Sequence, residues 1–156
     1  MSLSRSIRLI SGGRQDEGYA KAAFLPGTLL ELAADAAKSG VYTYQAHSTD
    51  GGSCQKTVAM EDALQGRTVD DIYAVDEVAT VWLPKQGDDM QYLLLAGGTT
   101  PVVIGTKLCS NGACRLIPVA DSGLAPIIDA DIVGEALEAL DITSGSTDTL
   151  IAVRVN

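Results

Sequence analysis

The chain has 156 residues, of which 46% are hydrophobic and 20% are charged, and its formal net charge at pH 7 is -9. This hydrophobic content excludes a disordered chain, and the length fits one domain with a core of its own. The acidic balance argues against nucleic acid or an anionic membrane as a partner, because binding to phosphates requires clustered Lys and Arg side chains.

The first 23 residues differ in character from the rest of the chain. They carry three arginines in an otherwise acidic sequence, and residues 11–13 (SGG) read as a flexible joint. We therefore expect residues 1–23 to form an N-terminal arm, with residues 1–10 extended. The arm either adds an edge strand to its own barrel or pairs with a neighbouring subunit or another surface by strand addition. Its candidate partner contacts are Leu3, Arg5, Ile7, Arg8, Leu9 and Arg14.

The same end of the chain shows no charged-then-apolar leader. No apolar run along the sequence approaches the ~20 residues that a membrane helix needs. We therefore expect a soluble protein that is not exported.

Residues 24–156 are predicted to form one mainly β domain. Short apolar runs rich in Val, Ile, Thr and Tyr alternate with clusters of Gly, Asp and Ser, which is typical of an all-β barrel or sandwich. We expect at most one or two short helices. Residues 31–38 have helical composition, although the same segment also fits the edge of a strand. The strand-like runs are 41–46, 56–60, 78–83, 91–95, 102–109, 114–119 and 149–155.

Possible catalytic or metal-binding chemistry centres on the single histidine, His47. It lies near Asp50 and Ser53, but the members of a hydrolase triad usually come from separate elements and not from one loop. The spacing of His47 and the cysteines is unlike that of a zinc ribbon, so we expect no metal site. A small ligand- or metal-binding barrel around His47, either an enzyme or a glycan-binding module, is the alternative function. The four potential zinc ligands are His47, Cys54, Cys109 and Cys114.

Two of the cysteines flank a turn signal. Asn111-Gly112 favours a two-residue hairpin turn. In that geometry Cys109 and Cys114 lie directly opposite each other, with β-carbons about 4.5–5.5 Å apart. This is slightly long for a disulfide, yet close enough for modest twist to bridge the pair.

The C-terminal segment predicts a hairpin. Residues 131–140 fit a helical period, but a Gly- and Ser-rich stretch at 143–148 separates them from the alternating run at 149–155, so the two segments can close an antiparallel pair. We expect the buried residues to include Trp82, Leu83, Leu94, Leu108, Ile117, Leu137, Ile151 and Val153.

Several segments, taken in order, resemble the small capsid cement (head decoration) proteins of tailed bacteriophages. The resemblance begins near residue 24 and covers about 130 residues. The segments are 24–32 (FLPGTLLEL), 64–73 (LQGRTVDDIY), 78–84 (VATVWLP) with 87–96 (GDDMQYLLLA), 103–108 with 114–118, and IVGEALEALD followed by DTLIAVRV at the C-terminal end.

The resemblance implies a β-tulip domain in which residues 131–140 form a strand. It also implies a homotrimer on the outer surface of an assembled capsid, at threefold and quasi-threefold axes, where it contacts the major capsid protein and stabilises the shell. Such a protein is synthesised in the host cytoplasm and becomes part of the virion. It is not an enzyme, and it has no cofactor, small-molecule substrate, nucleic-acid or membrane partner.

Overall fold

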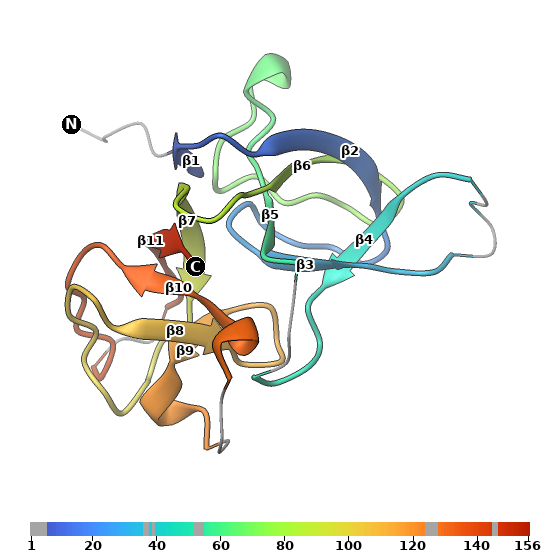
Figure 1. The fold of residues 1–156 in the computed structure, drawn as a ribbon. Coiled ribbons are helices and arrows are strands. Elements are labelled where there is room, and N and C mark those ends of the chain that lie inside the picture. Colours follow the sequence, from blue (N-terminus) through green and yellow to red (C-terminus); the bar gives the residue numbers. More distant parts are fainter. Residues whose placement is uncertain (1–5, 36–37, 39, 52–54, 124–127, 145–146) are drawn as a thin grey trace.

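The computed structural model describes residues 6–35, 38, 40–51, 55–123, 128–144 and 147–156 (Figure 1). Their regular secondary structure is almost entirely β, and all strands but β1 close into two five-stranded barrels, so the predicted all-β fold is confirmed. The described residues include three short 3-10 turns: η2 (Ala63–Gln65), η3 (Val119–Asp121) and η4 (Asp129–Asp131). No helix among them is long and apolar enough to span a membrane.

The first barrel has the strand order β2-β4-β3-β5-β6. Strands β2 and β6 close it as an antiparallel pair that runs from Arg14 opposite Leu83 to Tyr19 opposite Val78. Strands β2 and β4 form its one parallel pair in the described residues. The bounds are β2 (Arg14–Ala20), β3 (Leu29–Leu32), β4 (Thr43–Ala46), β5 (Thr57–Ala59) and β6 (Val78–Leu83).

The second barrel follows directly in the chain and has the order β7-β11-β10-β8-β9. Its ring closes where Leu116 of β9 pairs in parallel with Leu94 of β7. Strand β1 (Arg8–Ile10) joins the other end of β7 as an antiparallel neighbour. The remaining bounds are β7 (Asp89–Leu94), β8 (Lys107–Ser110), β9 (Leu116–Pro118), β10 (Ile132–Ala136) and β11 (Thr149–Val155).

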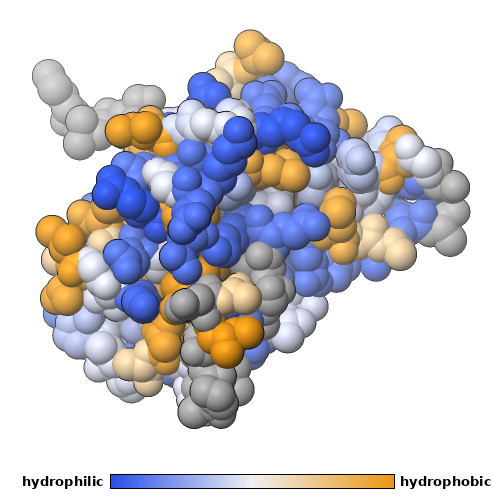
Figure 2. Space-filling view, in the orientation of Figure 1, coloured by the Kyte–Doolittle hydropathy of each residue, from blue (hydrophilic) through white to orange (hydrophobic). Residues whose placement is uncertain are grey.

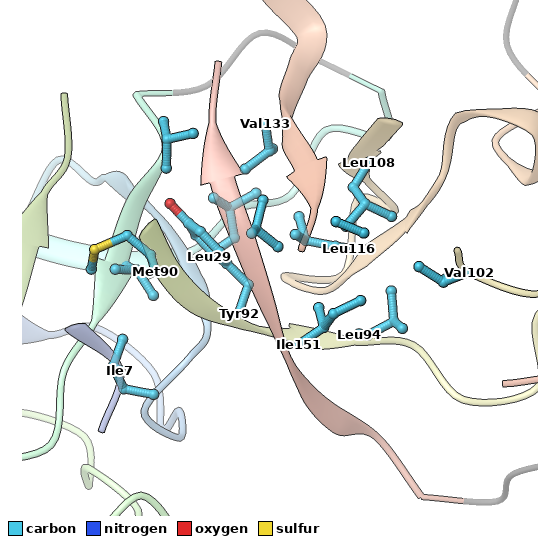
Figure 3. Packing of buried hydrophobic residues seen from close by; sticks show 14 of the residues in the cluster. Ile7, Leu29, Met90, Tyr92, Leu94, Val102, Leu108, Leu116, Val133 and Ile151 are labelled. Carbon is cyan, nitrogen blue, oxygen red and sulfur yellow. The ribbon is translucent and has the colours of Figure 1, made fainter. Parts of the chain in front are cut away.

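The two barrels are joined by a shared core. Because side chains alternate along a strand, β3, β5 and β6 bury both faces. One set of their side chains belongs to a cluster within the first barrel: Leu30, Ala59 and Val81. The neighbouring set packs in one cluster with residues of the second barrel: Leu29, Val58 and Trp82. Figure 3 shows Leu29 lying beside Tyr92 and Val133 in this shared core.

The predicted C-terminal hairpin is confirmed. Strands β10 and β11 are antiparallel, with Gly134 opposite Val155 and Ala136 opposite Val153. Of the eight residues predicted to be buried, six are. Leu83 and Leu137 are half-buried, because Leu83 ends β6 and Leu137 follows β10.

The ambiguous segment at 31–38 begins as a strand. Glu31 and Leu32 are the last two residues of β3, opposite Gln45 and Tyr44 of β4. Residues 36, 37 and 39 lie outside the described part, so the helical alternative for them stays a prediction.

The expected arm does not stand apart from the domain in the described residues. Residues 14–20 form β2 in the first barrel, and residues 8–10 form β1 on β7 of the same chain. The edge-strand alternative therefore describes β1, and contacts of residues 8–10 outside their own barrel stay a prediction. Strand β2 could not be predicted from its sequence, because most of its side chains are exposed and polar and it therefore lacks the alternation of apolar and polar residues that marks a strand.

The predicted opposition of Cys109 and Cys114 is wrong. Cys109 lies opposite Ile117, while Cys114 lies in the turn with a φ of 65°. The physical reason is the Asn111 side chain, whose Oδ1 accepts hydrogen bonds from the N–H groups of Ala113 and Arg115. These bonds organise a turn longer than two residues, so the register shifts by three positions.

Candidate interaction surface

The start of the described chain is fixed to the fold at Ile7. Its side chain is fully buried in the shared core. The Ile7 N–H donates to the Glu61 carboxylate at 3.0 Å, and the Ile7 carbonyl accepts from the N–H of Gln91 at 2.7 Å. Ile7 is therefore a core residue and not the partner contact that the sequence predicted.

The SGG segment is a second attachment point and not a flexible joint. The N–H groups of Gly12 and Gly13 donate to the Asp88 carboxylate at 2.7 and 3.0 Å, and the Lys85 N–H donates to it at 2.9 Å. A Cβ at Gly13 would lie 2.3 Å from the carbonyl oxygen of Leu83, so the close approach requires glycine.

These three hydrogen bonds, which we call the Asp88 clamp, change the pKa of the Asp88 carboxyl. The residue is only 6% exposed, and burial by itself raises the pKa of its carboxyl. The hydrogen bonds from Gly12, Lys85 and Gly13 outweigh burial and hold the pKa below its ordinary value of 3.8. The carboxylate therefore stays charged and holds the β1–β2 connection against the β6–β7 connection.

The other predicted contacts of this segment divide into three groups. Leu3 and Arg5 lie outside the described residues. Arg8 is exposed and stacks over the Trp82 ring at 4.8 Å, and Leu9 is 43% exposed. Arg14 is exposed and pairs with Asp16 at 3.5 Å. A contact of Arg8, Leu9 or Arg14 with a partner stays a prediction.

Several large hydrophobic side chains are exposed, and the sequence analysis did not predict them as possible contact residues. Leu64 is 97% exposed at the tip of η2, which Asp62 and Gly66 cap at its two ends. Figure 2 shows this turn as an apolar tip at the top of the molecule. Nothing in the sequence marks Leu64 as exposed, because an isolated leucine in a polar stretch can pack inward or project into solvent. Other large exposed hydrophobic residues include Ile10, Val41, Tyr42, Val78, Val103 and Ile104.

His47 lies at the junction of the barrels. It is 2% exposed, its Nδ1 lies 2.8 Å from Ser110 Oγ, and its Nε2 lies 3.9 Å from Glu31. These are the residue types of a hydrolase triad, but Ser110 is fully buried and its hydroxyl also accepts the Gly112 N–H. A serine nucleophile must reach its substrate, so the geometry favours a structural hydrogen-bond network between β4 and β8.

The side-chain partners of His47 are distant from it in the sequence. Its side chain contacts Ser110 and Glu31, and Ser53, which is near it in the sequence, lies outside the described residues. Among the potential zinc ligands, Cys54 also lies outside them. Within the described ranges, no three His, Cys, Asp or Glu side chains are grouped so that they could hold a metal ion.

The architecture defines the chain as an all-β protein built from two barrels with a common core. No protein-family model matches the sequence, and no curated protein matches it either. Among solved structures, the chain is similar to the N base of head fiber gp8.5 of bacteriophage phi29, with a TM-score of 0.57 and 11% sequence identity. The match covers 92% of this chain and 94% of that one, so the two share a fold over nearly their whole lengths.

Proposed function

We propose that this protein is a structural component of a tailed-bacteriophage virion, which binds the outer surface of the assembled head as a homotrimer and stabilises the shell. The observation that carries the proposal is the fold shared along nearly the whole chain with a head fiber base. We also propose that the protein is a decoration protein with a β-tulip fold. This part of the proposal rests on the sequence segments described above, which occur in the same order as in that family.

The surface supports a role in assembly. Aliphatic side chains project at separate places on both barrels, such as Leu64 on the first and Ile104 on the second. A subunit in a cyclic trimer needs two different contact surfaces for its neighbours and further surface for the shell. Several separate apolar positions fit that requirement better than one deep pocket does.

The proposed action is physical. Each trimer contacts several capsid subunits, so individually weak contacts add by avidity and must break together before the shell opens. The partner is the major capsid protein, and the protein is made in the host cytoplasm before it joins the virion. Catalysis plays no part in this proposal, which the burial of Ser110 beside His47 supports.

Two measurements test the proposal. Light scattering of the purified protein should give the mass of three chains. Isolated heads that carry the protein should open at a higher temperature than bare heads, because a ligand of the intact state stabilises it by mass action. A monomer that leaves the opening temperature of the heads unchanged would contradict the proposal.

A further inference from the structure

The outer face of the β2–β6 pair forms a groove, which we call the β2–β6 groove. Alternate residues of the two strands point away from the interior of the first barrel and form its floor. Glu17 lies opposite Thr80, and Tyr19 lies opposite Val78. The floor residues are Gln15, Glu17, Tyr19, Val78 and Thr80.

Two hollows lie along this groove. The first has a volume of about 470 Å³ and is bounded by the η2 turn, including Asp62 and Leu64. The second has a volume of about 340 Å³ and is bounded by Val41 and Tyr42. Glu17 lines both hollows, so they form one continuous surface along β2.

The second hollow is mainly apolar. Val41, Tyr42 and Val78 are each about half exposed in it, at 51%, 55% and 47%. The hollow therefore offers aromatic and aliphatic contacts to a side chain from outside.

Charge distinguishes between possible occupants. Glu17 is exposed between the hollows, and the described residues provide its carboxylate with no ion pair or side-chain hydrogen bond. A second copy of this chain is a poor source of the missing cation, because the chain has 11 basic against 20 acidic residues. Five of the 11 basic residues already form described ion pairs: Arg14, Lys38, Arg67, Arg115 and Arg154. Arg8, which lines the first hollow, lies over the Trp82 ring.

We propose that the β2–β6 groove binds an extended segment of a different, basic protein, with an apolar side chain in the second hollow and an Arg or Lys paired with Glu17. Recognition is by side chains: β6 pairs with β2 from Arg14 to Tyr19, and beside the second hollow β4 pairs with Tyr19 and Ala20 on the other edge. The inference rests on the proposed function and names the chemistry of the virion partner.

The test uses the intact protein and a synthetic probe, an acetylated and amidated pentapeptide of alternating valine and arginine. In an NMR titration, the peptide should shift the amide signals of Glu17, Tyr19, Tyr42 and Val78. Glu17→Gln should weaken binding about fivefold at low salt, which is the upper range for an exposed ion pair. Val78→Thr should weaken it as well, because it replaces an apolar contact by a hydroxyl.

Matched variants on the second barrel are the controls. Glu135→Gln makes the same charge change at an exposed position, and Val103→Thr makes the same apolar change at a residue that is 58% exposed. Both should bind the peptide as the unchanged protein does. Equal binding by Glu17→Gln, or equal binding of a peptide with glutamate in place of arginine, would overturn the inference.

Light scattering separates this inference from the proposed function. If Glu17→Gln and Val78→Thr dissociate the trimer, the groove is occupied by a second copy and the inference is wrong. If the trimer forms and stabilises heads but the peptide shifts no groove signal, the inference fails while the proposed function stands.

Discussion

Asp88 links the first described residues of the chain to the connection between the barrels. Its carboxylate accepts hydrogen bonds from three backbone N–H groups, two of them in the SGG segment. In the sequence Asp88 is one of two adjacent aspartates, and nothing local distinguishes it from an exposed loop residue. Its partners lie about 75 positions away, at Gly12 and Gly13.

We expect Asp88→Asn to destabilise the fold by about 1 kcal/mol, because the amide nitrogen leaves a part-buried backbone N–H without its acceptor. Hydrogen exchange at the amides of Gly12 and Gly13 should accelerate. Asp70→Asn, at an exposed aspartate, should change neither quantity. Unchanged protection at Gly12 in Asp88→Asn would rule out the clamp.

The same carboxylate predicts a pH dependence. Its pKa is lower in the folded chain than the ordinary 3.8, so its contribution to stability is complete above that value. The contribution is lost as the pH falls through the lower folded pKa. Urea unfolding of the unchanged protein and Asp88→Asn should therefore differ most above about pH 4 and converge as the pH falls below it.

The elements near the C-terminal end show what packing requires of a strand. Ile151 and Val153 are fully buried on one face of β11, which pairs with β10 on one side and with β7 on the other. Gly134 of β10 meets Arg154 so closely that an added Cβ would lie 2.2 Å from its carbonyl oxygen. This contact explains a glycine within an otherwise apolar strand.

Ile151→Ala should cost about 2–5 kcal/mol in the free energy of unfolding, because it leaves a cavity at the centre of the shared core. Leu137→Ala should cost less, about 1 kcal/mol, since Leu137 is half-buried beyond the end of β10. Thermal and urea melts measure both values. Equal costs would mean that Leu137 packs as deeply as Ile151.

At the scale of the whole molecule, the shared core makes the two barrels interdependent. Leu29 comes from the first barrel, yet it is fully buried in a cluster with Tyr92 and Val133 of the second (Figure 3). Strand β1 precedes the first barrel in the chain but pairs with β7, a strand of the second barrel. This path ties the barrels at several points.

We therefore expect one cooperative unfolding transition. Leu29→Ala should lower the stability by about 2–5 kcal/mol. Trp82 fluorescence and hydrogen exchange in β10 and β11 should report the same loss. If exchange in β11 stays at its original rate while the Trp82 transition shifts, the barrels unfold separately and the shared core does not couple them.

Local patterns in the sequence determined the all-β class, the positions of β6, β7 and β11, and the C-terminal hairpin, because apolar alternation and turn residues act within a few positions of each other. Tertiary structure decided how the strands pair and which exposed residues lie together. The turn bonds of Asn111 set the register at Cys109, a carboxylate distant in sequence holds Gly12 and Gly13, and the pairing of β2 with β6 brings Glu17 beside Thr80. Except for the Asn111 turn, these contacts join residues far apart in the chain, so their energies depend on distances in space that only the folded structure supplies.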